Sequence, residues 1–300
     1  MFGTLPGVTH DPASRTSDLF DRFVTRPRDT RGPYGWGRVA AGFAVVGILG
    51  MGLVVVVGVA LAMFTPEQGG PSPVVMVGQL AGVAVWVPVV WLAARTLFSM
   101  RLGDLMSVLP GVRWGLFAQA LGIAVVGFGA YAVYIHARSG TPLVALTVPV
   151  VLGVVAAVVL IPLQALAEEL VFRGFGPQMV LGKIGTSRVA TAAVFAVASA
   201  LFASFHAASN AITWFVFFVF GLVFVALVRV TGGIEAAWAL HAVNNVFFVV
   251  GGILRGQDLT AKQTDVTVGF DVFVQMGVMV AVAAVVALVA RGRRAADPAR

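Results

Sequence analysis

Three ionisable residues stand together directly after a long apolar run in the middle of the chain. The stretch ALAEELVFRG contains Glu168, Glu169 and Arg173. Residues four apart share a helix face, so Glu169 and Arg173 can pair in a supporting role, while Glu168 points about 100° away. One carboxylate is then neutralised, and the other is free to act on a water molecule or a substrate. A salt bridge that closes a helix at the membrane surface is the simpler interpretation, and this motif alone does not decide between them.

Two later stretches each place an amide side chain four residues after a histidine. FASFHAASN contains His206 and Asn210, and HAVNN contains His241 and Asn245. Each pair lies on one face if the stretch is helical. Taken alone, a histidine of this kind can be a packed residue, and an asparagine can be an interhelical hydrogen-bond partner.

Composition explains why these polar residues deserve a joint interpretation. Hydrophobic residues make up 59% of the 300 and charged residues 11%, and the mean hydropathy is +0.96, whereas a soluble domain has roughly 25% charged residues. Several apolar runs reach the length of about 20 residues that crosses the hydrocarbon core as a helix. They are continuous rather than short and alternating, which excludes a β-barrel. The sequence therefore predicts an all-α fold, a polytopic transmembrane helix bundle.

We expect about eight spans in one helical domain at residues 39–290. The predicted spans are residues 39–64, 73–94, 115–135, 144–167, 189–207, 211–230, 234–254 and 270–290. The polar residues 1–38 lack the apolar region of a signal peptide, and we interpret them as a partly disordered cytoplasmic tail. Residues 291–300 form a second, basic cytoplasmic tail.

The distribution of basic residues predicts the orientation. With both termini in the cytoplasm, 17 of the 20 Lys and Arg lie on the inner side, and only Arg138, Arg255 and Lys262 lie outside, as the positive-inside rule requires. The net charge of +7 is explained by this asymmetry and by anionic membrane lipids, so nucleic acid is not an expected partner. The richness in Arg, Val, Ala and Gly is typical of a GC-rich bacterial genome, which favours a bacterial plasma membrane.

Polar side chains inside spans are costly unless they face one another, so one shared site is expected. A carboxylate and an imidazole can hold and deprotonate a water molecule. A second histidine and an asparagine can donate hydrogen bonds to the oxyanion that forms when this water attacks an amide. Alternatively, Glu168, His206 and His241 bind Zn²⁺, and the metal activates the water. The chain has no cysteine, which excludes a thiolate nucleophile or thiolate metal ligands.

The ordered set EExxxR, FxxxH and HxxxN on successive apolar helices resembles the CPBP or Abi family of intramembrane proteases, which includes the CAAX prenyl endopeptidases. The motifs stand here as EELVFR at 168–173, FASFH at 202–206 and HAVNN at 241–245. The resemblance covers roughly residues 144–254.

The resemblance implies roles for individual residues. It assigns water activation to Glu168 and His206, and oxyanion binding to His241 and Asn245. Family members have been described both as metalloproteases and as metal-independent glutamate proteases, and the absence of an HExxH pair here favours the second. The substrate implied is a peptide or membrane protein, and in one branch of the family a prenylated CAAX protein.

Other classes of membrane protein remain as alternatives. A non-catalytic partner, such as an immunity or scaffold protein, would keep the fold without the chemistry. An ion-coupled transporter would also bury such groups, but it would show broken helices in two related halves, which are not visible. The GxSG and GxGD motifs of other intramembrane proteases are absent.

The predicted spans conflict with a shared site in one respect. They place Glu168 near the inner surface and His206 near the outer one. Because an α-helix rises 1.5 Å per residue, the separation approaches the thickness of a bilayer. Either the fourth helix continues past Arg173, with a kink at Pro162, or the boundaries near residues 190–212 are displaced.

Overall fold

The computed structural model describes residues 19–64, 73–206, 210–257 and 270–296. Within these residues the regular structure is helical, and one isolated antiparallel bridge joins Ser107 to Gly233. Eight helices are long and apolar enough to cross a membrane, which confirms the predicted bundle. These spans are Trp36–Ala60, Val77–Phe98, Trp114–Ser139, Val148–Ile184, Arg188–Phe205, Ala211–Thr231, Glu235–Leu254 and Asp271–Arg293.

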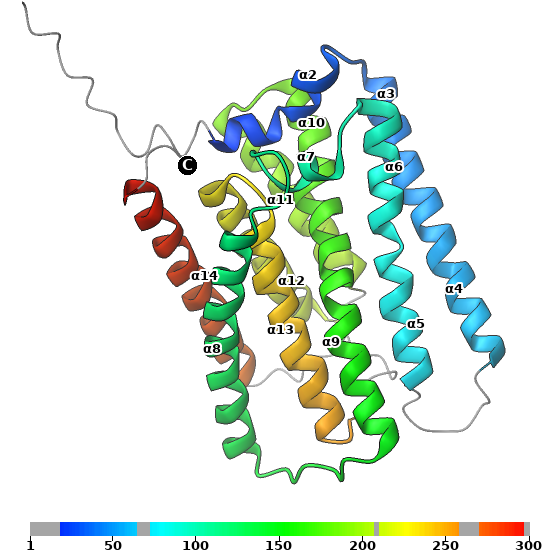
Figure 1. Ribbon diagram of the computed structural model, residues 1–300, viewed down its shortest axis with the longest axis vertical. Coiled ribbons are helices and arrows are strands. Elements are labelled where there is room, and N and C mark those ends of the chain that lie inside the picture. The colour runs from blue at the N-terminus through cyan, green and yellow to red at the C-terminus, as the bar shows by residue number, and fades with distance from the viewer. Residues whose placement is uncertain (1–18, 65–72, 207–209, 258–269, 297–300) are drawn as a thin grey trace, which may run out of the picture.

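The spans are built from the helices shown in Figure 1, where the α-helices are labelled. In chain order these are α2 (Arg26–Arg31), α3 (Trp36–Ala44), the π-helix η1 (Val45–Leu49), α4 (Gly50–Phe64), α5 (Pro73–Ala84), α6 (Trp86–Phe98), α7 (Leu102–Met106), α8 (Trp114–Ser139), α9 (Val148–Glu169), the π-helix η2 (Leu170–Phe175), α10 (Gly176–Ile184), α11 (Arg188–Phe205), α12 (Ala211–Thr231), α13 (Glu235–Leu254) and α14 (Phe270–Ala296).

Helix α13 lies at the centre of the bundle, between α8 and α9 (Figure 1). It is the most deeply packed span, with 50% of its apolar stretch buried, against 11% for the first span. Trp238 fixes α13 to both neighbours: its Nε1 donates to the Pro162 carbonyl of α9 at 2.7 Å, and its ring lies 4.3 Å from that of Phe117 on α8. Polar residues of α13 are therefore held away from lipid.

A buried ion pair holds the first turn of α13. The Arg113 guanidinium, just before α8, donates to both carboxylate oxygens of Glu235, at 2.9 and 2.6 Å. It also donates to the Thr231 carbonyl at 2.6 Å, at the end of α12. The Glu235 side chain is fully buried, so the pair ties α8, α12 and α13 together where α13 begins.

The fourth span is longer than predicted. The sequence-based end at residue 167 is wrong, because the helix continues through η2 and α10 to Ile184. Of the two alternatives, continuation past Arg173 is the one that the structure contains, whereas α11 begins and ends close to its predicted bounds. The charged residues after Ala167 do not end the helix because they are buried against partners within the bundle. They therefore lie well inside the span.

A close backbone approach accompanies the π-helix η2. A Cβ built on Gly174 would lie 2.8 Å from the Leu105 carbonyl oxygen of α7, an atom that cannot swing aside as a side chain can. The absence of a side chain at Gly174 thus lets η2 pack directly on α7. One wider turn of this kind inside an α-helix is frequent at functional sites.

We expect Gly174→Ala to destabilise the protein by about 1–3 kcal/mol, the usual cost of overpacking. The matched control is Gly47→Ala in η1, where a new Cβ meets nothing within 4 Å and the change should be neutral or slightly stabilising. Thermal unfolding in detergent measures both variants. Equal unfolding midpoints would contradict the close approach.

Part of the predicted N-terminal tail packs on the bundle. Residues 19–24 and α2 are helical, and Phe20 and Phe23 are buried in the core. The Tyr34 hydroxyl donates to the Met179 carbonyl of α10 at 2.9 Å. Burial raises the pKa of Tyr34 to about 12, so the phenol keeps its proton and remains a donor. The rest of the predicted tail, residues 1–18, lies outside the described residues.

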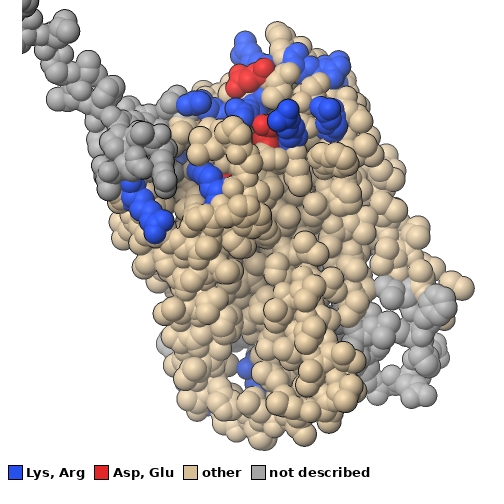
Figure 2. Space-filling view, viewed as in Figure 1, with Lys and Arg blue, Asp and Glu red and all other residues tan. Residues whose placement is uncertain are grey.

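Lys and Arg gather at the end of the molecule that carries α2 and α10, while the body of the bundle shows few charges (Figure 2). The helix termini explain this: Arg95 and Arg229 lie in the last turns of α6 and α12. At the opposite end, Arg138 lies in the last turn of α8 and Arg255 caps α13. The bundle thus has one strongly basic end.

Candidate active site

The carboxylate of Glu169 accepts hydrogen bonds from two buried groups, the Arg173 guanidinium and the His241 ring. Its Oε1 lies 3.1 Å from Nη1 of Arg173 and 2.8 Å from Nδ1 of His241. The side chains of Glu169 and Arg173 are 0% and 1% exposed. The ion pair between residues four apart is therefore present, and its charges are neutralised inside the bundle.

His241 lies between the two adjacent glutamates. Nδ1 faces Oε1 of Glu169 at 2.8 Å, and Nε2 faces Oε2 of Glu168 at 3.5 Å. Because an ionised carboxylate only accepts, Nδ1 must carry a hydrogen, and Nε2 of the neutral ring is then an acceptor. Two acceptors cannot bind each other directly, so the position between Nε2 and Glu168 requires a proton or a bridging water. Sequence spacing did not predict that both glutamates contact one histidine.

Glu168 is the less constrained of the two carboxylates. Its Oε1 accepts a hydrogen bond from Nε2 of Gln164 at 2.5 Å, whereas its buried Oε2 has no hydrogen-bond partner in the part of the chain that the structure describes. Its side chain is 12% exposed, against 0% for Glu169. A buried carboxylate oxygen without a donor is costly, and this oxygen is therefore a ready acceptor for a proton or a water hydrogen.

His206 follows directly on α11 and belongs to the same region. Its Nδ1 lies 2.8 Å from the Phe202 carbonyl, so Nδ1 donates and Nε2 is left as an acceptor. Its ring stacks on Phe217, with 4.0 Å between centroids. Glu168 and His241 are among the charged groups that act electrostatically on His206. The continuation of the fourth helix removes the predicted mismatch in depth.

Aromatic rings surround the buried charges. The Arg173 guanidinium carbon lies 4.2 Å from the Phe202 centroid and 5.1 Å from that of Phe224. Phe224 stacks on His241 at 4.8 Å, and Phe202 lies 4.5 Å from the ring of His206. Phe202 also lies 5.8 Å from the ring of His241, so it contacts Arg173, His206 and His241. Such rings attract the guanidinium and exclude water.

Asn245 lies one turn further along α13, where it contacts α9. Its Nδ2 donates to Oε1 of Gln164 at 3.4 Å, and its Oδ1 accepts from Asn244 at 2.9 Å. Asn244 in turn accepts from Gln275 of α14 at 3.3 Å. Sequence analysis missed Gln164 and Gln275, although Gln164 is a polar residue four positions before Glu168 in an otherwise apolar stretch, and therefore on the same helix face.

The predicted zinc ligands do not form a ligand set here. In the described part of the chain, no three or more His, Asp or Glu residues are arranged to hold a metal ion. Nδ1 of His241 and of His206 contacts other groups of the protein, which leaves Nε2 of each ring free, as in a metal ligand. A zinc site also needs three donors that converge at about 2.0–2.2 Å, and the described side chains are not arranged in that way.

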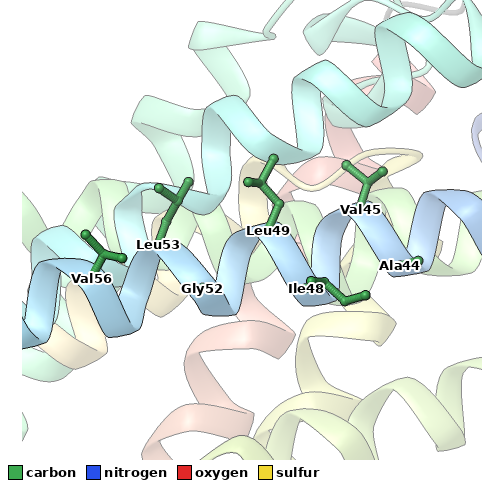
Figure 3. Close-up of a pocket in the computed structure, with 7 residues that line it drawn as sticks. All are labelled: Ala44, Val45, Ile48, Leu49, Gly52, Leu53 and Val56. Carbon is green, nitrogen blue, oxygen red and sulfur yellow. The ribbon is translucent and has the colours of Figure 1, made fainter.

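The bundle also carries a separate apolar groove of about 570 Å³ along α3, η1 and α4. Its lining residues are Ala44, Val45, Ile48, Leu49, Gly52, Leu53 and Val56 (Figure 3). Ile48 is 76% exposed and Val56 61% exposed, so this surface faces lipid. The groove has no polar side chain that could take part in hydrolysis.

The fold and these contacts define an integral membrane protein with glutamate and histidine side chains buried between its helices. Residues 149–247 match the family model described as Type II CAAX prenyl endopeptidase Rce1-like. This segment contains all three motifs, and its match agrees with the resemblance to the CAAX proteases of the CPBP family. The match supports CAAX-type intramembrane protease activity in general. No curated protein and no solved structure matches the chain.

Proposed function

We propose that the chain is an intramembrane endopeptidase that hydrolyses a peptide bond with a water molecule activated by Glu168 and His206. The observation that carries this proposal is the buried Oε2 of Glu168, which has no hydrogen-bond partner among the described residues and faces Nε2 of His241 at 3.5 Å. Its position beside a histidine, in surroundings lined by aromatic rings, suits a general base.

In this mechanism Oε2 of Glu168 removes one proton from the water. Nε2 of His206, an acceptor because Nδ1 donates to Phe202, orients the other hydrogen. The resulting hydroxide forms a bond to the carbonyl carbon, and the oxygen of the peptide becomes an oxyanion. When the C–N bond breaks, the leaving amine takes the proton back from Glu168, so the enzyme returns to its starting state.

His241 and Asn245 stabilise the oxyanion in this proposal. In this role Nε2 of His241 carries a hydrogen that it donates to the oxyanion, while the contact of Nδ1 with Oε1 of Glu169 at 2.8 Å fixes the orientation of the ring. Asn245 has Nδ2 in a long hydrogen bond of 3.4 Å to Gln164, beyond the usual range. This weak bond is easily exchanged for a bond to the oxyanion.

For the substrate, we propose a peptide or membrane protein, with prenylated CAAX peptides as the first class to test because of the family match. We further propose that the basic end of the bundle, with both chain termini, faces the cytoplasm of a bacterial cell, following the positive-inside rule. The site then lies within the membrane on the side of the basic end, where η2 and the first turns of α13 are found (Figure 1).

Purified protein in liposomes tests the proposal against a panel of peptides. The panel contains a farnesylated CAAX peptide, the same peptide without the lipid, and membrane-protein segments, and products are identified by mass spectrometry. We expect cleavage at one internal bond of at least one peptide, unaffected by a strong chelator. Cleavage that needs zinc would replace the glutamate mechanism with a metal mechanism, and no cleavage of any peptide would favour a non-catalytic partner.

A further inference from the structure

We propose that Gln164 is a positioning residue that determines which oxygen of Glu168 receives the proton. The inference rests on the proposed function and adds a residue outside the three motifs. Gln164 is 8% exposed, and it contacts both Glu168 and Asn245 from a position one turn before Glu168 on α9. It therefore joins the residue proposed to activate water to one proposed to bind the oxyanion.

Four amide side chains form a hydrogen-bonded chain that ends on the Glu168 carboxylate. Gln275 donates to Asn244, Asn244 to Asn245, Asn245 to Gln164, and Gln164 to Glu168, at 3.3, 2.9, 3.4 and 2.5 Å. The four residues come from α14, α13 and α9. Three helices that are distant in sequence thus contribute to one polar path inside the bundle.

The direction of this chain follows from the charge at its end. An ionised carboxylate accepts but cannot donate, so Gln164 must turn Nε2 toward Glu168. Its Oε1 then faces Asn245, which must donate with Nδ2 and accept with Oδ1. The same reasoning orients Asn244 and Gln275. One ionised carboxylate therefore sets the orientation of every amide in the chain.

The consequence for catalysis is that the two oxygens of Glu168 differ. Oε1 accepts a hydrogen bond from Gln164 and is less basic, because that bond stabilises the charge. Oε2 has no donor and faces His241. Gln164 thus keeps the more basic oxygen directed toward the position where water would bind, and prevents rotation of the carboxylate group.

Two substitutions test this role, one by the loss of the donor and the other by its dependence on pH. Gln164→Leu removes the donor, and we expect kcat to fall by about 10- to 100-fold with KM unchanged, as for a lost hydrogen bond to a charged group. Gln164→Glu keeps the shape, but its carboxyl donates only when it is protonated. We therefore expect the activity of Gln164→Glu relative to wild type to rise as the pH falls, which a merely structural residue would not produce.

The matched control is Gln178→Leu, which removes a buried glutamine later in the same span. Its Nε2 donates to the Asp104 carbonyl at 3.2 Å, away from Glu168. We expect this variant to lose stability but to keep the wild-type kcat and pH profile. Wild-type kcat in Gln164→Leu, while Glu168→Gln is inactive, would overturn the role of Gln164 and leave the proposed function intact.

An infrared measurement keeps the inference testable if no peptide is cleaved. The carboxylate band of Glu168 is identified as the band that disappears in Glu168→Gln. We expect this band to shift in Gln164→Leu and to stay in place in Gln178→Leu, because Gln164 donates to that carboxylate and Gln178 donates to the Asp104 carbonyl instead. An unshifted band in folded Gln164→Leu would overturn the proposal whether or not the chain is a protease.

Discussion

Replacing Glu168 by glutamine is expected to lower kcat by about 10²–10⁴-fold, the usual contribution of a general base. Glutamine has the same shape and still offers an oxygen to Gln164, which donates to Oε1 in the native protein. It cannot take a proton from water at the position of Oε2. The fold should be retained, because the charge removed has no ion-pair partner other than His241 at 3.5 Å. Initial rates on the peptide that wild type cleaves fastest measure the effect.

The control for this prediction is Asp271→Asn. This variant makes the same change, from a carboxylate to an amide, at an exposed site. Asp271 lies in the first turn of α14, where its side chain is 47% exposed and pairs with Arg138 at 2.9 Å. We expect nearly wild-type kcat in this variant. If Glu168→Gln and Asp271→Asn had equal activity, Glu168 could not be the base.

The second large effect is expected from Arg173→Met, which should destabilise the protein by about 3–5 kcal/mol, because it leaves a buried charge without its partner. The carboxylate of Glu169 is fully buried, and only His241 would remain to accompany it. Methionine also forfeits the contacts of the guanidinium with Phe202 and Phe224. Thermal unfolding in detergent, together with the yield of folded protein, measures the loss.

A double variant separates the lost ion pair from lost packing. Glu169→Gln combined with Arg173→Met removes both charges, so we expect it to be more stable than the sum of the single effects predicts, as for interacting partners. Additive effects would show that the two charges do not interact. For comparison, Arg138→Met removes a pair with Asp271 whose side chains are 52% and 47% exposed. That loss should be about 0–1 kcal/mol.

The membrane bundle could be predicted from the sequence because continuous apolar runs leave few alternatives in lipid. The end of the fourth span could not be predicted from the sequence. The predicted span ends at residue 167, which places Glu168 near the inner surface, whereas Glu169 and Arg173 neutralise each other inside the bundle. A π-helix depends on packing, here of Gly174 against Leu105, and the local sequence carries no signal for it.

The N-terminal segment was also beyond the reach of sequence patterns. Its composition is polar, but Phe20 and Phe23 are buried, and Arg229 of α12 lies 5.6 Å from the ring of Phe20. The apolar residues of this short segment can be buried only after the spans have assembled, because the surface that they pack against belongs to the bundle. Hydropathy averaged over a window cannot reveal such a contact.

The members of the candidate site could be predicted from motif spacing, but their mutual contacts could not. Spacing places residues on a helix face and says nothing about how one helix is rotated against another. That rotation makes His241 contact both glutamates and brings Gln275 of α14 to Asn244 of α13. A single amide in an apolar run, such as Gln164, is the sequence signal for a polar contact between helices.

The proposed mechanism requires that Glu168 activates water for peptide hydrolysis without a metal ion. Single-turnover cleavage by wild type and by Glu168→Gln, in liposomes containing a strong chelator, tests this requirement, with product detected by mass spectrometry. We expect wild type to cleave its peptide at an undiminished rate and Glu168→Gln to yield no product on the same timescale. Equal cleavage by both proteins, or wild-type cleavage that stops with chelator and returns with zinc, would contradict it.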